Sequence, residues 1–197
     1  MTTVAGLLLA AGFSRRFGAN KLLQPVSPST CVASQACATL RHGVDFVLAI
    51  IRPGQTELAS ILTGVGAEVV VFEAAEQGMG ASLAHGVRLS MKADGWVVGL
   101  ADMPWIRSET VLAVTQALRS GAPLVVPVHD HRRGHPVGFG SGFLEELLIL
   151  RGDRGAKSIL DRHASRIHRL PCDDPGIHQD IDCPADLEVP GHPMPRR

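Results

Sequence analysis

The sequence has no net charge and no long apolar run, and each of these absences excludes a class of protein. Its 197 residues carry 19 Lys and Arg against 19 Asp and Glu. The basic surplus that proteins need to coat nucleic acid or an acidic membrane is therefore missing. No apolar run reaches the length of a membrane-spanning helix. A chain of this length with 45% hydrophobic residues is expected to form one globular domain.

Paired cysteines and a secretory signal are also missing. Cys31, Cys37, Cys172 and Cys183 form no CxxC pair, so neither a zinc site nor a disulfide framework is expected. No basic residue precedes the first apolar run, and a signal peptide needs one. We therefore expect a cytoplasmic protein.

The glycine-rich segments lack two well-known fingerprints. Neither 78–83 (GMGASL) nor 138–142 (GFGSG) completes the GxGxxG pattern. Residues 12–21 lack the spacing of a Walker P-loop. These absences disfavour a nicotinamide-dependent oxidoreductase and a P-loop NTPase.

Apolar runs that predict strands alternate with patterns that predict helices. Besides the apolar run that opens the chain, strands are expected at 44–51, 68–72, 95–100 and 124–128, and helices at 53–62, 108–119, 142–150 and 154–163. This alternation predicts an α/β fold with a mostly parallel sheet and helices on both faces. We expect a single domain over 1–188, followed by a proline-rich tail at 189–197 without regular structure.

The chain opens with a predicted buried strand that leads into a loop rich in glycine and positive charge, VAGLLLAAGFSRRFGANK at 4–21. Open α/β sheets bind ligands at loops that leave the carboxyl ends of their strands. Glycines let the backbone approach a phosphate closely, and cationic side chains supply charge. These residues are Gly12, Gly18, Arg15, Arg16 and Lys21. We expect an anion site here, the alternative being a surface turn with solvated arginines.

Two acidic motifs indicate a metal site. Asp102 lies in LADMP, directly after the predicted strand 95–100, and Mg²⁺ commonly binds one or two carboxylates plus substrate phosphates. The alternative is that Asp102 only caps backbone amides of a turn. Near the end of the chain, the alternation in DID predicts that Asp180 and Asp182 share one face of a short strand. One or both could reach the metal, although solvated carboxylates are the commoner outcome.

The GMGASL segment precedes a predicted helix that runs to about residue 91. Gly78 and Gly80 permit close approach of a ligand to the backbone, and Ser82 with the start of the helix offers donors to a base, ribose or phosphate. A flexible turn between strand and helix is the alternative.

A fourth segment, HDHRRGHPVGF at 129–139, combines three histidines with two arginines. Imidazoles suit zinc, but no second ligand cluster at the spacing of a metal site accompanies them. We expect this segment to line the pocket of a second, anionic substrate, with the GDRGA segment at 152–156 close by. The residues expected there are Arg132, Arg133 and His135 from the first segment and Asp153 and Arg154 from the second.

Taken together and in this order, the motifs resemble the MobA-like nucleotidyltransferase family, and within it the molybdenum cofactor cytidylyltransferase branch. The resemblance rests on LLLAAGFSRRFGANKLL, QGMGASL, LADMPWI, RGHPVGF, GDRGAKSIL and DIDCPADL, spread over residues 7–187. It implies a Rossmann-like sheet, Mg²⁺, a nucleoside triphosphate, and nucleotidyl transfer to a phosphorylated acceptor with release of pyrophosphate.

The resemblance also implies roles for single residues. The nucleotide loop of the family falls on Leu9, Ala10, Ala11, Gly12, Ser14, Arg15 and Arg16, its phosphate-binding lysine on Lys21, and its metal aspartates on Asp102 and Asp182. Cytidylyl members typically carry LAAG where guanylyl members carry LAGG, so Ala11 favours CTP. One departure follows Gln24, where relatives have a DGKPLL-like turn and this chain has VSPSTCVAS.

The reaction that the resemblance implies is transfer of CMP from CTP to the terminal phosphate of molybdopterin, with Lys21, Arg16 and Asp102 as catalytic residues. A molybdenum hydroxylase or its chaperone would be the partner that receives the product. Two alternatives stay open: guanylyl or other nucleotidyl transfer to a different phosphorylated acceptor, and a non-catalytic chaperone that binds molybdenum cofactor.

Overall fold

The protein folds around one mixed sheet. The computed structural model describes residues 2–13, 17, 20–153 and 155–187. In that part of the chain the sheet has eight strands, in the order β3-β2-β1-β4-β7-β5-β6, with β8 also paired to β5. The strands are β1 (Val4–Leu9), β2 (Phe46–Ile51), β3 (Glu68–Val71), β4 (Gly95–Leu100), β5 (Leu124–His129), β6 (Arg132–Arg133), β7 (Val137–Gly140) and β8 (Ile167–Pro171).

The sheet is mostly parallel, as the sequence predicts. The pairs β1–β2, β1–β4, β2–β3 and β5–β8 are parallel, whereas β7 is antiparallel to both β4 and β5, and β6 is antiparallel to β5. The sequence did not predict β6, β7 or β8. β7 is a glycine-containing stretch of four residues, and β8 carries polar side chains at the edge of the sheet, so neither has the apolar run that indicates a buried strand.

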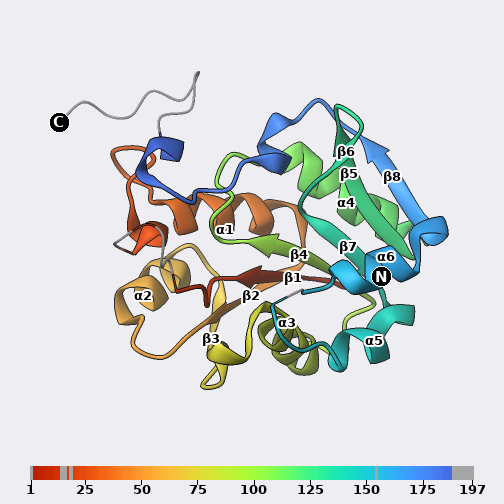
Figure 1. Ribbon diagram of the computed structural model, residues 1–197, viewed down its shortest axis with the longest axis horizontal. Coiled ribbons are helices and arrows are strands. Elements are labelled where there is room, and N and C mark those ends of the chain that lie inside the picture. The colour runs from red at the N-terminus through yellow and green to blue at the C-terminus, as the bar shows by residue number, and fades with distance from the viewer. Residues whose placement is uncertain (1, 14–16, 18–19, 154, 188–197) are drawn as a thin grey trace.

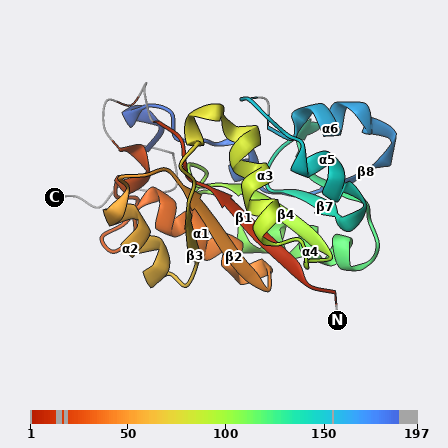
Figure 2. The same cartoon turned by 90° about the horizontal axis from the view of Figure 1, so that it is seen from below.

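Helices cover both faces of the sheet, as predicted. They are α1 (Val32–Gly43), α2 (Thr56–Gly64), α3 (Met79–Leu89), α4 (Ser108–Arg119), α5 (Leu144–Leu148) and α6 (Lys157–Arg162). Figure 1 shows α1 and α4 on one side of the sheet and α3 and α5 on the other. In Figure 2, the view turned by 90°, α3 crosses over β1. None of the described helices is both long enough and apolar enough to cross a bilayer.

Each face of the sheet has its own hydrophobic core because side chains alternate along a strand. On β1, Val4 and Leu8 pack into the core shared with α1, α2 and α4, whereas Leu7 belongs to the core under α3, α5 and α6. Leu40 of α1 approaches the sheet over Gly6 of β1, where a Cβ would lie 3.1 Å from its Cγ. A side chain at that position would push Leu40 outward, so the glycine allows the close fit of α1 over β1.

Candidate functional site

The candidate site lies at the carboxyl ends of β1 and β4, which are neighbours in the sheet. Leu9 and Leu100, the last residues of these strands, are paired in register. The N–H of Ala101 donates to the carbonyl of Leu9 at 3.1 Å. The two loops that follow these strands therefore start side by side. This brings the LAAG loop, residues 9–12, next to Asp102.

The centre of the site is the ammonium group of Lys21. Its Nζ donates to Oδ2 of Asp102 at 2.8 Å and to Oδ1 of Asp182 at 3.2 Å. Lys21 begins the short 3₁₀ helix Lys21–Leu23, whose Leu22 is buried and whose first residue follows the N-cap Asn20. The structure thus brings together a lysine and two carboxylates that are 81 and 161 positions away from it in the sequence.

The electrostatics of the site favour a charged lysine. Burial alone would lower the pKa of Lys21, but the hydrogen bonds and negative charges of Asp102 and Asp182 outweigh this effect and raise the pKa above its ordinary value. The side chain of Lys21 is only 12% exposed. The ammonium group of Lys21 therefore stays protonated between the two carboxylates at neutral pH.

Asp102 and Asp182 reach the lysine in different ways. Asp102 follows the end of β4 in a tight turn, in which the N–H of Met103 donates to the carbonyl of Leu100 at 3.2 Å. The strand predicted through Asp180 and Asp182 is wrong, because this segment has no regular secondary structure. It is held instead by Ile181, which is fully buried and whose N–H donates to the carbonyl of Asp102 at 2.8 Å. Asp182 meets Lys21, and Asp180 is exposed.

A cleft of about 430 Å³ opens beside these three residues. Many of the residues that the sequence predicts for the site line it, and they come from the LAAG loop, the lysine segment, the start of α3 and the two acidic motifs. They are Leu9, Ala10, Ala11, Gly12, Lys21, Gly78, Ser82, Asp102, Asp153 and Asp182. The cleft is large enough for a small-molecule substrate.

Another part of the cleft lining is formed where the start of α3 meets residues 151–153. Gly78 has a φ of 99°, and a Cβ at this position would lie 2.5 Å from Oδ1 of Asp153. The N–H of Gly80 donates to the carbonyl of Gly152 at 2.7 Å. Gly80 itself does not line the cleft. The two glycines thus let the 151–153 loop pack directly against the start of the helix.

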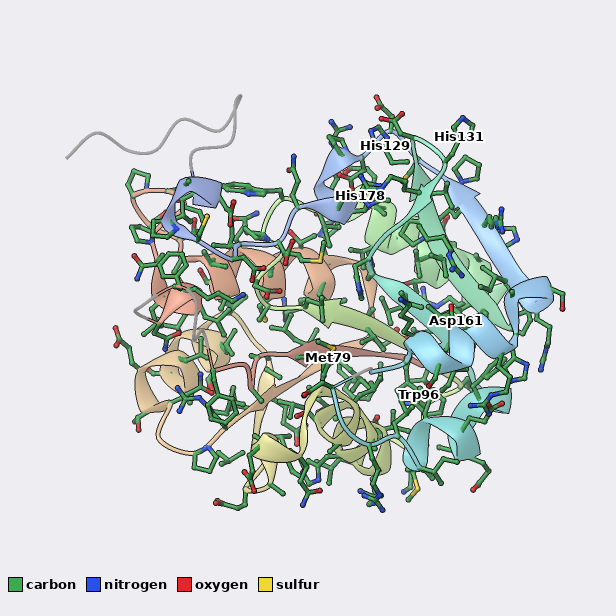
Figure 3. The ribbon with its side chains drawn as sticks, viewed as in Figure 1. Met79, Trp96, His129, His131, Asp161 and His178 are labelled. Atoms are coloured by element: carbon green, nitrogen blue, oxygen red, sulfur yellow. The ribbon has the colours of Figure 1, made fainter. Side chains whose placement is uncertain are left out.

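Three residues expected to bind the acceptor, Arg132, Arg133 and His135, do not line the cleft. Arg132 is exposed on β6. Arg133 lies exposed on β6, 3.8 Å from a carboxylate oxygen of Asp161 in α6. His135 lies outside the cleft, where burial lowers its pKa and its Nδ1 has no hydrogen-bond partner among the described residues. In Figure 3 the nearby His129 and His178 are likewise well separated from Met79, which lines the cleft.

The predicted site also includes residues outside the described part of the chain, namely Ser14, Arg15, Arg16, Gly18 and Arg154. The sequence analysis in turn missed several lining residues, among them Phe13, Phe17, Glu76 and Met79. Phe13 and Phe17 flank the arginine pair of the first loop, and apolar residues in so polar a loop were the signal that could have found them. The guanidinium carbon of Arg52 lies 5.3 Å from the centre of the Phe13 ring.

Asp102 and Asp182 are the residues that could hold a divalent metal. Both carboxylates line the cleft and converge on one positive charge. Mg²⁺ takes oxygen ligands and is usually bound through one or two carboxylates plus substrate phosphates and waters. The donor set fits that ion. Within the described ranges, no group of three or more His, Cys, Asp or Glu side chains is arranged to hold a metal.

Comparisons with known proteins agree with this geometry. The purine catabolism protein PucB of Bacillus subtilis (strain 168) is 33% identical over 202 residues, which cover 93% of this chain and 94% of PucB. The crystal structure of Rv0371c from Mycobacterium tuberculosis H37Rv has a TM-score of 0.80 at 26% identity and covers 94% of this chain and 95% of that one. Its homologue from Mycobacterium sp. strain JC1 has a TM-score of 0.82 at 27% identity and covers 94% and 93%.

The family assignment follows from a match over most of the chain. The sequence model of the MobA-like NTP transferase domain matches residues 6–167, which include the LAAG loop, Lys21 and Asp102. The chain therefore belongs to the MobA-like NTP transferase domain family and is a nucleotidyltransferase.

Proposed function

We propose that the protein transfers CMP from CTP to the terminal phosphate of molybdopterin and releases pyrophosphate. The observation that supports this most is the meeting of Lys21, Asp102 and Asp182 beside the LAAG loop in one cleft. Ala11 of that loop carries the preference for CTP, because the loop matches the pattern of cytidylyl rather than guanylyl members. In this proposal a molybdenum hydroxylase or its chaperone receives the product.

The acceptor phosphate needs no general base. A phosphomonoester has a second pKa of about 6, so most of it is doubly ionised at neutral pH. A terminal phosphate oxygen attacks the α-phosphorus of CTP and forms a new P–O bond. The bond between the α-phosphorus and the bridging oxygen breaks, and pyrophosphate leaves with that electron pair. The protein is left with positioning the two substrates and neutralising their charge.

Each part of the cleft has a role in this reaction. Lys21 neutralises charge that develops on the transferred and leaving phosphates, and the backbone of residues 9–12 cradles the triphosphate together with Arg16. Asp102 and Asp182 hold Mg²⁺, which supplies further neutralisation of phosphate charge when bound. Gly78 and Ser82 line the cleft at the start of α3 and contact the nucleotide. Gly80, which does not line the cleft, supports this part of it through its hydrogen bond to Gly152.

The acceptor side of the proposal rests mainly on Asp153. It lines the cleft beside the start of α3, next in the chain to Arg154. Arg133 and His135, which the sequence analysis placed with them, lie outside the cleft. Arg133 and His135 could bind the acceptor only if the bound molybdopterin extends out of the cleft.

Two structures of similar fold show which ligands to test. A complex of Rv0371c with manganese has a TM-score of 0.76 at 24% identity and covers 94% of this chain and 96% of that one. A CMP:2-keto-3-deoxy-manno-octonic acid synthetase in complex with CTP has a TM-score of 0.71 at 14% identity and covers 95% and 96%. Their ligands are properties of those proteins, and they suggest a divalent metal and CTP as the first candidates here.

The proposed reaction can be tested with purified protein. We expect incubation with Mg²⁺, molybdopterin and each NTP in turn to give a CMP adduct of molybdopterin and pyrophosphate with CTP, detected by mass spectrometry, and no adduct after EDTA. A GMP adduct, or transfer only to a different phosphorylated acceptor such as a sugar phosphate, would support the other transferase hypothesis. Binding of molybdopterin without any pyrophosphate release would support the chaperone hypothesis.

The choice of CTP is expected to depend on Ala11, which lines the cleft and is 8% exposed. Replacing Ala11 by Gly removes a methyl group and leaves more room for a purine base. A methyl-sized change in a pocket alters discrimination by about 10-fold or more. We expect the ratio of kcat/KM for CTP over GTP to fall by about that factor. Ala10→Gly is the matched control, because Ala10 occurs in both loop patterns, and an equal fall in this control would contradict the assignment.

A further inference from the structure

The segment that carries Asp182 depends on side chains for its position, because it lacks a strand or a long helix. It runs from Ile181, which is fully buried, to Leu187, which is 6% exposed. Only the 3₁₀ helix Pro184–Leu187 gives it regular structure. Both ends are thus anchored in the core, and Asp182 lies between them.

The side chain of Asp186 accepts hydrogen bonds from the backbone of the same segment. One oxygen of its carboxylate, Oδ2, accepts the backbone N–H of Asp182 at 2.8 Å and that of Cys183 at 2.7 Å. The N–H of Asp186 donates in turn to the carbonyl of Cys183 at 3.1 Å. The backbone hydrogen bonds from Cys183 and Asp182, together with a smaller effect of the Lys21 charge, hold the pKa of Asp186 below its ordinary value.

Asp182 depends more than Asp102 on hydrogen bonds that fix its backbone. Its side chain is 34% exposed against 24% for Asp102, and its contact with Lys21 is longer, 3.2 Å against 2.8 Å. Asp102 lies two residues after the end of β4, whereas the backbone N–H of Asp182 is fixed by Asp186. A shift of that backbone would move the Asp182 carboxylate away from Lys21 and Asp102.

We propose that Asp186 is a positioning residue that holds Asp182 in place for binding the divalent metal. This inference rests on the proposed function, in which Asp182 is a metal ligand. Asp186 does not line the cleft and touches the site through the backbone of Asp182 and Cys183. Groups that orient metal ligands change metal affinity by about 10- to 100-fold when they are removed.

The experiment compares three substitutions of Asp186. Asp186→Asn keeps a carbonyl oxygen that can accept both N–H groups but loses the charge. Asp186→Glu keeps the charge but displaces the acceptor by a methylene group, and Asp186→Ala removes the acceptor. Asp45→Ala is the matched control, because Asp45, the residue before β2, also accepts a backbone N–H, that of Val4 at 2.7 Å. Val4 is the first residue of β1, so this contact lies at the opposite end of that strand from the site.

Binding of Mn²⁺ in the presence of CTP is measured by calorimetry, alongside the Mg²⁺ dependence of pyrophosphate release and thermal unfolding. We expect Asp186→Ala and Asp186→Glu to weaken Mn²⁺ binding by about 10-fold, and kcat to recover at saturating Mg²⁺. Asp186→Asn and Asp45→Ala should stay within about threefold of the wild type, a change well below that of removing the orienting group.

The outcomes separate this inference from the proposed function. Unchanged Mn²⁺ affinity in Asp186→Glu and Asp186→Ala, with normal binding by the wild type, overturns the positioning role alone. A loss in Asp186→Asn as large as in Asp186→Ala also overturns it, because charge rather than hydrogen bonding would then be responsible. If Asp186→Ala does not fold, Asp186→Glu decides the matter. Absence of Mn²⁺ binding in the wild type with CTP overturns the metal assignment itself, and the role of Asp186 with it.

Discussion

Replacing Asp102 by Ala should lower kcat for pyrophosphate release from CTP by about 10²- to 10³-fold, the usual cost of losing one group that stabilises the transition state. Asp102 contacts Lys21 at 2.8 Å and is the better buried of the two carboxylates that contact this lysine. Its loss removes a proposed metal ligand and an ion-pair partner of the lysine. Steady-state kinetics over a range of Mg²⁺ concentrations provides the measurement.

The fold should survive this substitution, because the hydrogen bond from Ile181 goes to the backbone carbonyl of Asp102 rather than to its side chain. Asp180→Ala is a suitable control, since it removes the same charge from an exposed position two residues from Asp182. We expect that control to keep its activity. Full activity of Asp102→Ala would contradict the metal assignment. Asp182→Ala is made for comparison with the control. An equal loss of activity in Asp180→Ala and Asp182→Ala would contradict the choice of Asp182 over Asp180 as the second metal ligand.

Replacing Lys21 by Met should have two effects of opposite sign. Catalysis should fall by about 10²- to 10³-fold, because the charge that neutralises the phosphates is lost. Binding of Mn²⁺ to the nucleotide-free protein should become tighter, because the ammonium no longer neutralises Asp102 and Asp182. Methionine keeps the length of the apolar stem, so the neighbouring packing should change little. Pyrophosphate release and calorimetric titration with Mn²⁺ measure the two effects separately.

Lys92→Met is the matched control for this variant, because Lys92 is an exposed lysine in the turn before β4 and makes no contact with the cleft. We expect neither kinetics nor Mn²⁺ binding to change in it. Weaker Mn²⁺ binding in Lys21→Met would mean that the lysine supports the carboxylates rather than competing with a cation for them.

The parts of the fold that the sequence predicts are those with strong local patterns. β4 and α4 have the predicted bounds, Gly95–Leu100 and Ser108–Arg119, because a continuous apolar run and a regular apolar periodicity identify them. β7 and β8 lack such patterns. Their pairing depends on β5, which lies between them in the sheet, and this neighbour is not visible in the local sequence.

The candidate site also contains residues whose positions the sequence predicts and residues whose positions it does not. Lys21 and Asp102 could be predicted, because each lies in a loop that follows a recognisable strand and such loops meet at one edge of a parallel sheet. The position of Arg133 could not be predicted. Its segment is rich in positive charge, but the hairpin of β5 and β6 directs it toward Asp161 rather than toward the cleft.

By itself, the sequence determined the α/β class, the LAAG loop and the acidic residue after β4, since these depend on patterns within about ten residues. Only the tertiary structure decided that Asp182 rather than Asp180 contacts Lys21, and that Asp186 accepts the backbone N–H of Asp182. Lys21 and Asp182 are 161 positions apart. Their contact depends on the burial of Ile181 and on its hydrogen bond to the Asp102 carbonyl, and a hydrogen bond between distant segments forms only when the whole sheet is assembled.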